Sequence, residues 1–391
     1  MKICMILPKG LPVPAVKGGA IETLVNDVID ENEKESKLEI TVVSLYDIDA
    51  EQVSKKYENT KFIYIKDDFH YRIKAVLVRI KNLLRKDKLN TYNEVVLDNI
   101  KKEKYDYIIV EDGAFMSFKS YLKYFKKEQM ILHFHHNGES DRWTDQTFST
   151  YLGVSEFVAN TFKKSSKIED IKVLKNGIKI EKFLTASEDE KNEIREKYNF
   201  KKDDFVIVFC GRLIPEKGIL ELVRAVKSIE NDKIKLMIVG SINFGVDCTT
   251  DYLKLLKKEI EETKNRITQT GYINNNELYK YYQSADLGVI PSIWEDAAPL
   301  VTVEMMINKL PLIITKSGGA PEYASKDTII IPKDDKIVET LKTSIIDLYK
   351  NKEKRNEIVR KSYNHAKKFT TNKFYEDFVN ILRLKEENKN E

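Results

Sequence analysis

Short runs of β-branched and aromatic residues alternate with longer amphipathic stretches along this chain of 391 residues. Such alternation is typical of a parallel β-sheet, because parallel strands are joined by long crossover connections that are usually helices. The pattern predicts strands in the first part of the chain at 2–7, 39–45, 61–65, 105–110 and 130–134, with helices such as 20–34 and 70–88 between several of them. The expected fold class is α/β, with a doubly wound parallel sheet covered by helices on both faces.

The same alternation begins again in the second half of the chain. Strands are expected at 205–210, 234–239, 266–269, 286–290, 310–314 and 328–331. Helical patterns are expected at 217–229, 250–263, 275–283 and 302–308, and then at 337–350 and 351–388. Because the chain is longer than one domain of about 150 residues, we predict two Rossmann-like domains.

A turn dipeptide, Asn176-Gly177, leads into a highly charged and presumptively exposed stretch that separates the two alternating regions. We place the domain boundary near it, which gives an N-terminal domain at 1–182 and a C-terminal domain at 183–368. The last stretch, 369–391, is expected to be a helix that crosses back and packs towards the N-terminal domain.

Charge and cysteine content exclude several classes of protein. Lys+Arg 66 and Asp+Glu 62 leave a net charge of only +4, so the chain is not marked as a nucleic-acid-binding protein. Its three cysteines are odd in number and lack CxxC spacing, which predicts a reducing, cytoplasmic location without a disulfide framework or zinc site. No apolar run approaches the roughly 20 residues that span a bilayer, and no signal peptide is expected.

The strongest local pattern follows the strand expected at 205–210. Gly211 and Gly218 enclose a loop that carries Arg212 and Lys217, and a helix begins directly after it. Glycine allows a close backbone approach, and a helix N-terminus favours an anion. Two cations at the same place would neutralise a diphosphate, although a loop with merely solvated cations is the alternative.

A second pattern lies at 291–323, where Glu295 and Asp296 follow a strand end and Glu304 lies in an apolar helical stretch. Carboxylates accept hydrogen bonds from hydroxyl groups. Acids separated in this way would hold a sugar ring at one place and a ribose at the other. The alternative is that Glu304 is simply an acid near a helix N-terminus, where the helix dipole favours it.

Three histidines, His133, His135 and His136, follow or end the strand expected at 130–134. Along a strand His133 and His135 share one face and His136 points to the other. One interpretation of these histidines is a metal site formed by His133 and His135 with Glu139. Another is a histidine with a purely structural role.

The stretch 70–88 predicts an amphipathic, cationic helix. Its cations are Arg72, Lys74, Arg79, Lys81, Arg85, Lys86 and Lys88, against Asp87, and its apolar residues are Ile73, Val76, Leu77, Ile80, Leu83 and Leu84. Such a helix would lie on an anionic membrane surface. The alternative is a packed surface helix with a solvated basic face.

Taken together these motifs resemble a known family, the retaining glycosyltransferases of the GT-B fold in glycosyltransferase family 4 (group 1). The resemblance covers nearly the whole chain, with the motifs in the family's order. The matching segments are the Gly-Gly loop at 17–22, the domain end at 176–178, the GRL…EKG segment at 211–218, the base-lining segments at 271–273 and 286–292, and the E-x7-E pair at 296–304.

The resemblance implies roles for residues at the matching positions. The catalytic-site residues would be His135, with His136 as the alternative, together with Asp296 and Glu304. The donor-binding residues would be Gly18, Gly19, Arg212, Lys217, Gly271, Ile273, Glu295, Leu300 and Val301. The family depends on no metal or other cofactor, and we read the Asp47-Ile48-Asp49 pattern as a loop.

Two departures from the family pattern concern the sugar pocket. The spacing places Asp296 where the family has Glu, with Glu295 one residue earlier as the alternative acid. Pro299, which has no N–H, replaces the loop glycine before Leu300 and Val301. Both departures lie where the donor sugar would bind.

The implied function is transfer of a sugar, with retained anomeric configuration, from a nucleotide-diphosphate sugar to an acceptor hydroxyl. The resemblance also implies that the acceptor is a glycan or a lipid-linked molecule in bacterial cell-surface polysaccharide assembly. It implies that the protein is cytoplasmic or peripheral on the inner face of the membrane. Because a fold does not fix a function, a nucleotide-sugar epimerase or phosphorylase and a non-catalytic nucleotide-sugar-binding protein are the alternatives.

Overall fold

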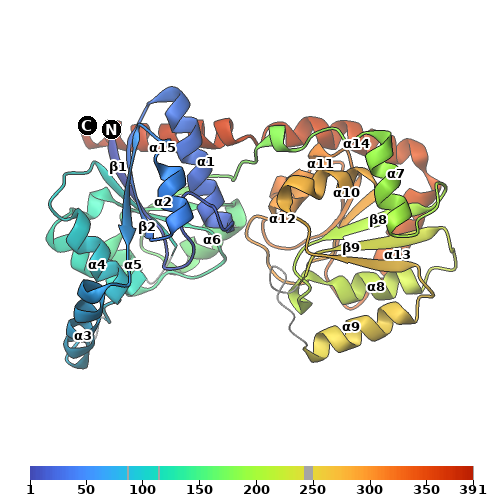
Figure 1. Ribbon diagram of the computed structural model, residues 1–391, viewed down its shortest axis with the longest axis horizontal. Coiled ribbons are helices and arrows are strands. Elements are labelled where there is room, and N and C mark those ends of the chain that lie inside the picture. The colour runs from blue at the N-terminus through green and yellow to red at the C-terminus, as the bar shows by residue number, and fades with distance from the viewer. Residues whose placement is uncertain (86–87, 113–114, 242–249, 391) are drawn as a thin grey trace. The chain divides into compact units, whose positions relative to one another are not determined.

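The computed structural model describes residues 1–85, 88–112, 115–241 and 250–390. Lys86 and Asp87 of the predicted cationic helix lie outside the described residues, as does Cys248, one of the three cysteines. The chain divides into two compact units, Met1–Gly177 with Thr371–Glu391 and Ile178–Thr370 (Figure 1). Within the described residues, no helix is both apolar enough and long enough for a transmembrane span.

The first unit contains a seven-stranded, wholly parallel sheet in the order β3-β2-β1-β4-β5-β6-β7. Its strands are β1 (Lys2–Ile6), β2 (Glu39–Leu45), β3 (Thr60–Ile65), β4 (Tyr107–Glu111), β5 (Met130–Phe134), β6 (Thr150–Gly153) and β7 (Asp170–Val173). The central strands β1, β4 and β5 are buried on both faces and are therefore rich in Ile, Val and Leu. The sequence analysis missed β6 and β7 because four-residue strands carry too little periodicity.

Helices lie on both faces of this sheet (Figure 1). They are α1 (Ala20–Glu35), α2 (Ile48–Ser54), α3 (Phe69–Leu83), α4 (Thr91–Ile100), α5 (Arg142–Thr147), α6 (Glu156–Ser165) and α15 (Thr371–Asn390), with the 3₁₀ helices η1 (Phe115–Lys123) and η2 (Lys127–Gln129). The loop predicted at Asp47-Ile48-Asp49 is wrong. Asp47 instead caps α2, because its carboxylate accepts hydrogen bonds from the backbone N–H groups of Asp49 and Ala50.

The C-terminal helix α15 belongs to the first unit although the second unit precedes it in the chain. It packs along α1, where the Thr371 hydroxyl donates to Glu31 at 3.0 Å and the Tyr375 hydroxyl donates to Asn32 at 2.6 Å. Its apolar side chains enter the core between α1 and the sheet; they are Phe374, Tyr375, Phe378, Val379 and Leu382.

The second unit contains a six-stranded parallel sheet in the order β10-β9-β8-β11-β12-β13. Its strands are β8 (Phe205–Cys210), β9 (Ile234–Val239), β10 (Ile267–Gly271), β11 (Leu287–Ile290), β12 (Leu312–Thr315) and β13 (Ile329–Ile331). Its α-helices are α7 (Glu188–Lys197), α8 (Ile219–Lys227), α9 (Asp251–Glu261), α10 (Leu278–Gln283), α11 (Leu300–Ile307), α12 (Ala320–Tyr323), α13 (Ile337–Lys350) and α14 (Lys352–Ala366). The 3₁₀ helices are η3 (Ile180–Lys182), η4 (Pro215–Lys217) and η5 (Asn275–Glu277).

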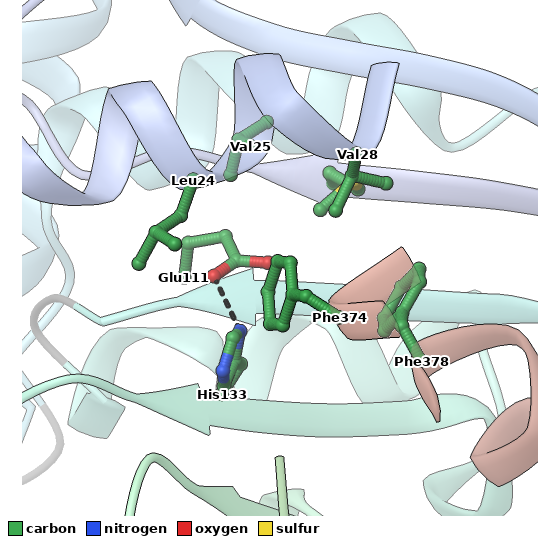
Figure 2. Close-up of a pocket in the computed structure, with 8 residues that line it drawn as sticks. Leu24, Val25, Val28, Glu111, His133, Phe374 and Phe378 are labelled. Carbon is green, nitrogen blue, oxygen red and sulfur yellow. Dashed lines mark hydrogen bonds and ion pairs between the residues drawn. The ribbon is translucent and has the colours of Figure 1, made fainter. Parts of the chain in front are cut away.

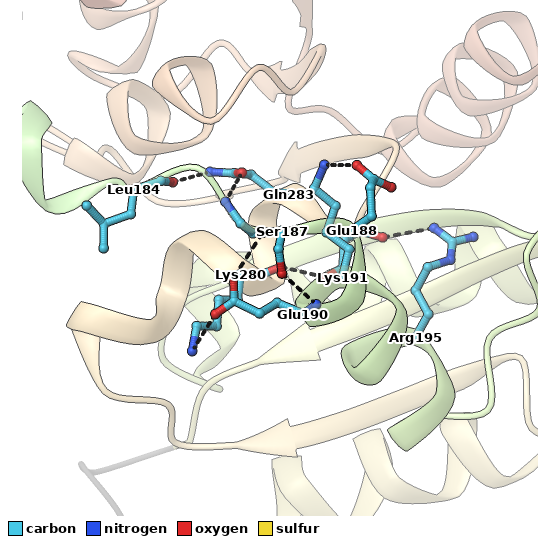
Figure 3. Close-up of polar contacts among 10 residues, drawn as sticks. Leu184, Ser187, Glu188, Glu190, Lys191, Arg195, Lys280 and Gln283 are labelled. Carbon is cyan, nitrogen blue, oxygen red and sulfur yellow. Dashed lines mark hydrogen bonds and ion pairs between the residues drawn. The ribbon is translucent and has the colours of Figure 1, made fainter.

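The charged segment after Gly177 is part of the second unit, so the boundary predicted at 182 falls inside that unit. The Ile178 backbone N–H donates to the Phe369 carbonyl at 2.9 Å, which holds the start of this charged segment against the residues that follow α14. Ser187 and Glu190 then form a capping box that begins α7 (Figure 3). Arg195 on α7 donates to the carbonyl of Ser284, so the polar segment is ordered by specific contacts.

Both sheets reverse their strand order at one place, between β1 and β4 in the first unit and between β8 and β11 in the second. In open α/β sheets, ligands bind outside the carboxyl ends of the strands at such a switch point. The candidate residues should therefore be sought in the loops that follow these four strands.

Candidate active site

In the second unit, the switch point is formed by the loop after β8 and the loop after β11. Gly218 ends the first loop and precedes α8 with φ +66°, and a Cβ at this position would lie 1.9 Å from the carbonyl oxygen of Pro291. The carbonyl of Glu216 accepts hydrogen bonds from the backbone of Ile293 and Trp294 at 3.0 and 3.2 Å. The two loops that carry the predicted cations and acids are thus held directly against each other.

Arg212 lies at the end of β8 and lines a pocket at the carboxyl edge of the sheet. The pocket is lined by Cys210, Gly211, Arg212, Val239, Gly240, Ser241, Tyr272, Ile273, Asn275 and Leu278. The Arg212 side chain is exposed and forms no ion pair within the part of the chain that the structure describes. The sequence analysis placed Arg212 and Ile273 in one donor site, and the structure brings both to this pocket.

Gly271 lies at the end of β10, one strand away from Gly240, and is not among the residues that line the pocket. Its carbonyl accepts the Gly240 N–H at 3.0 Å, and its own φ is +76°. Gly271 therefore supports the pocket wall through the backbone next to Tyr272 and Ile273.

Lys217 forms an ion pair with Asp296, with 2.5 Å between Nζ and Oδ1. Both side chains are largely buried, with 25% and 15% exposed. The second carboxylate oxygen of Asp296 is buried and accepts no hydrogen bond from any residue that the structure describes. A buried acceptor of this kind is available to a ligand hydroxyl.

Glu295 has a different set of partners. Its carboxylate accepts the backbone N–H of Gly318 and forms an ion pair with Lys333. These contacts fix the turn at Ser317 and Gly318, where the Asp296 carbonyl also accepts the Gly319 N–H at 2.7 Å. The structure thus gives Glu295 a role in holding the turn and leaves Asp296 with the open acceptor.

Glu304 lies on α11 and accepts a hydrogen bond from the Tyr282 hydroxyl at 3.0 Å. Burial raises the pKa of Glu304, although the hydrogen bond from Tyr282 opposes this effect. Tyr282 also lies near Cys210, whose thiol pKa burial raises to about 12. Cys210 lines the pocket, and the Tyr282 side chain lies between Cys210 and Glu304.

Leu300 and Val301 form the first turn of α11, directly after Pro299. No side chain caps this end of the helix. The first N–H groups of a helix lack partners within the helix, and they attract anions. This placement suits the phosphate contact that the sequence analysis assigned to Leu300 and Val301.

In the first unit, the loop after β1 ends at Gly18 and Gly19. Gly19 begins α1 with φ +95°, and a Cβ there would lie 2.1 Å from Oε2 of Glu22. Burial raises the pKa of Glu22, and the nearby His135 opposes that shift. The Gly-Gly loop and His135 are therefore neighbours at this switch point.

The histidines after β5 are held by two consecutive acids at the end of β4. Glu111 contacts both His133 and His135, whereas His136 contacts Asp112 at 3.0 Å on the other face of the sheet. The metal alternative named Glu139, and that choice of acid is wrong: the ligand-type group at His133 and His135 contains Glu111. Sequence reasoning missed Glu111, although an acid that ends an otherwise apolar strand was a visible signal.

The fold is that of solved glycosyltransferases. The crystal structure of HepE from Anabaena in complex with UDP has a TM-score of 0.75 and 18% sequence identity, and the likeness covers 98% of this chain and 100% of that chain. The predicted fold class is confirmed: the chain has two Rossmann-like units of the GT-B fold.

The sequence is also similar to known glycosyltransferases. Residues 190–365 match the family model described as glycosyl transferases group 1. The Bacillus subtilis protein provisionally named glycosyltransferase YtcC is 25% identical over 344 residues, which cover 84% of this chain and 78% of that protein. The Escherichia coli UDP-Gal:alpha-D-GlcNAc-diphosphoundecaprenol alpha-1,3-galactosyltransferase is 31% identical over 154 residues, 38% of this chain and 37% of that enzyme. The segment 190–365 is thus similar to the group 1 glycosyl transferases, which is consistent with the predicted resemblance.

Proposed function

We propose that this protein transfers a hexosyl unit, with retained configuration and without a metal ion, from a nucleoside-diphosphate sugar to an acceptor hydroxyl in polysaccharide assembly. The observation that carries the proposal is the pocket at the second switch point, where Arg212 stands exposed at the end of β8. HepE, which has the same fold, was solved with UDP, with UDP and glucose and with UDP-glucose.

The first task of such a site is to neutralise the leaving diphosphate. As the bond from the sugar to the diphosphate breaks, negative charge grows on the phosphate oxygens and positive charge on the sugar carbon. Arg212 and Lys217 supply two fixed cations, and the N–H groups at Leu300 and Val301 supply dipoles. These groups perform the charge stabilisation that a divalent metal ion performs in other transferases.

The second task is to hold the donor. His135 and the open oxygen of Asp296 accept hydrogen bonds from sugar hydroxyls, and Glu304 accepts from the ribose. Gly18 and Gly19 carry no side chains at this loop; the Gly18 N–H donates to the Ala15 carbonyl at 3.2 Å, and the Gly19 N–H is the one that would face the donor. The leaving phosphate takes the proton of the acceptor hydroxyl on the same face of the sugar, so no protein nucleophile is required.

Nucleotide binding is the direct test of this proposal. We expect UDP at about 100 times its Kd to stabilise the second unit by about 2.7 kcal/mol, which raises its melting temperature by roughly 5 to 10 °C. Thermal unfolding with UDP, ADP and GDP measures the shift. Tyr272→Ala, which removes a side chain that lines the pocket, should reduce it, and Tyr124→Ala, an exposed tyrosine in the other unit, should not. No shift with any of these nucleotides would contradict the proposal.

We also propose that the protein docks on an anionic membrane through α3. Tyr71 and Val78 are the buried side chains of this helix. The opposite side bears a stripe of exposed apolar residues, Phe69, Ile73, Val76, Leu77, Ile80 and Leu83, which Leu84 extends. This arrangement supports membrane docking over the alternative of a packed surface helix with a solvated basic face, because the side of α3 that packs and the side that bears the apolar stripe are different faces.

Cations flank this stripe on both sides. At 100° per residue, Arg72 and Arg79 fall on one edge of the stripe, and Lys74 and Lys81 fall on the other. An apolar stripe between two basic edges matches an anionic bilayer, where apolar side chains enter the interface and the cations meet phosphate groups. A lipid-linked acceptor of the kind named for the E. coli relative would lie in the same membrane.

Sedimentation with lipid vesicles tests the membrane proposal. We expect binding to phosphatidylglycerol vesicles and a loss of about 10-fold or more in affinity for the double variant Leu77→Ser/Ile80→Ser, because each side chain loses about 1 kcal/mol of partial burial. Leu255→Ser removes an equally exposed leucine on α9 and serves as the control. Equal binding to phosphatidylcholine vesicles, or equal binding by the double variant, would refute docking through α3.

A further inference from the structure

Glu111 and His133 lie side by side on neighbouring strands of the first sheet. They are register partners in the parallel pairing of β4 with β5. His135 lies two residues after His133 and therefore points to the same face. The Glu111 and His133 side chains lie beneath α1 and α15, and Figure 2 shows Leu24, Phe374 and Phe378 around them.

One carboxylate oxygen binds both imidazole rings. Oε2 of Glu111 lies 2.8 Å from Nδ1 of His133 and 2.8 Å from Nε2 of His135. The two ring centroids are 4.1 Å apart. Burial alone would raise the pKa of Glu111, but His133 and His135 outweigh it and lower that pKa to about 2. Glu111 is therefore an ionised carboxylate at neutral pH.

The Glu111 and His133 side chains face a dry, apolar space. This space is lined by apolar side chains of β1, α1 and α15 and is too small for a water molecule; the lining residues besides Glu111 and His133 are Met5, Leu24, Val25, Val28, Phe374 and Phe378. The hydrogen bonds of Glu111 are thus made by protein groups alone. In a dry environment each of these bonds is stronger than in water.

The proton positions follow from the chemistry of the donors. An ionised carboxylate only accepts, so each ring nitrogen that faces Oε2 must carry a proton. For His135 that nitrogen is Nε2. Burial lowers the pKa of His135 and keeps the ring neutral, and a neutral imidazole has a single N–H. Nδ1 of His135 is therefore unprotonated, and it accepts no hydrogen bond from the described residues.

Charged groups on each neighbouring element act on the same ring. Glu111 and Asp112 on or after β4 favour its protonation, His133 on β5 opposes it, and Glu22 on α1 lies within electrostatic reach. None of them contacts Nδ1. Glu111 is thus the group that decides which nitrogen holds the proton.

We propose that Glu111 is a positioning residue that locks His135 in the Nε2–H tautomer and so presents Nδ1 as a hydrogen-bond acceptor for a hydroxyl of the donor sugar. This inference rests on the proposed function, in which His135 contacts the sugar. It adds that the contact is directional: the sugar hydroxyl donates and the imidazole accepts. His133 shares the same oxygen and keeps the Glu111 carboxylate turned towards the pair.

A metal ion accounts less well for the same cluster. Zn²⁺ on the nitrogens that face Glu111 would displace their protons, and the N–H groups would then lie on Nε2 of His133 and Nδ1 of His135. No described residue offers an acceptor to either atom. Buried N–H groups without partners are rarer in proteins than unsatisfied acceptors, and metal-bound histidines almost always donate their second N–H.

Long-range ¹H–¹⁵N NMR of the histidine rings tests the proposal directly, because it distinguishes Nδ1–H from Nε2–H. The chain has only 5 histidines, so His70→Gln, His133→Gln, His136→Gln and His365→Gln assign four of the signals in the full-length protein and leave the fifth to His135. We expect the wild-type His135 ring to be a single Nε2–H tautomer. Glu111→Leu should convert it to a mixture, and His136→Gln, which removes a ring held by Asp112, should leave it unchanged.

Glu111→Gln provides a variant of nearly the same size in case Glu111→Leu does not fold. Its amide still offers an oxygen but no charge, so the Nε2–H signal of His135 should weaken relative to wild type without vanishing. A wild-type ring protonated on Nδ1, or a His135 signal unchanged in both Glu111 variants, overturns the proposal. One equivalent of zinc in the purified protein by elemental analysis also overturns it.

The same samples separate this inference from the proposed function. The nucleotide pocket lies in the other unit, so Glu111→Leu should retain the UDP-induced rise in melting temperature, and the dispersion of its NMR signals shows whether the first unit is folded. Absence of that rise in every sample would contradict the proposed function without affecting the tautomer result.

Discussion

Arg212→Ala is expected to lower kcat about 100-fold or more while the protein stays folded. Removing one preorganised donor from the charge that develops in a transition state costs about 10²- to 10³-fold. The Arg212 side chain is exposed and makes no ion pair among the described residues, so its loss breaks no structural contact of that kind. Release of nucleoside diphosphate from the donor that gives the largest thermal shift measures kcat.

Lys217→Ala should have an effect of the same order on kcat with an additional loss of stability. The substitution removes the cation and also leaves the largely buried carboxylate of Asp296 without its ion-pair partner. Lys254→Ala, which removes an exposed lysine on α9 in the same unit, is the matched control for general charge effects. Normal rates for both Arg212→Ala and Lys217→Ala would refute the diphosphate assignment.

Gly218→Ala should be the most destabilising single methyl addition at the site. The residue adopts a left-handed φ of +66°, and the new Cβ would stand 1.9 Å from the Pro291 carbonyl oxygen. Left-handed strain of about 1 kcal/mol and overpacking of about 2 kcal/mol together predict a loss of about 3 kcal/mol. Urea unfolding of the purified protein measures this loss through the midpoint of the transition.

Gly271→Ala separates the two contributions to that loss. Gly271 has a similar φ of +76°, but a Cβ there would meet nothing within 4 Å. Only the backbone strain of about 1 kcal/mol should therefore appear. Equal losses of unfolding free energy for the two variants would show that the Pro291 carbonyl can move aside without cost. The two switch-point loops would then not be rigidly joined.

The features that sequence reasoning predicted correctly are those that local patterns encode. The strands from β8 to β13 are short apolar runs between helical stretches, and each was expected within a few residues of its place. Gly211 and Gly218 likewise predict a turn and the start of a helix. β6 and β7, in contrast, have only four residues each, and Asp170 and Lys172 interrupt the apolar pattern of β7.

The features that could not be predicted depend on register between distant segments. Lys217 and Asp296 are 79 residues apart, and their pairing follows from the adjacency of β8 and β11. Glu111 meets His133 and His135 only because β4 pairs with β5 in one particular register. The different partners of Glu295 and Asp296 depend on the turn at Gly318, whose backbone N–H donates to Glu295.

The return of α15 to the first unit has a consequence for how the protein is made. The buried side chains of α15, among them Phe374 and Phe378, complete the core between α1 and the first sheet. During synthesis from the N-terminus, the ribosome releases all of Ile178–Thr370 before these side chains emerge. The second unit can therefore finish folding first. The first unit, although translated earlier, keeps an exposed apolar surface between α1 and its sheet until α15 has been synthesised.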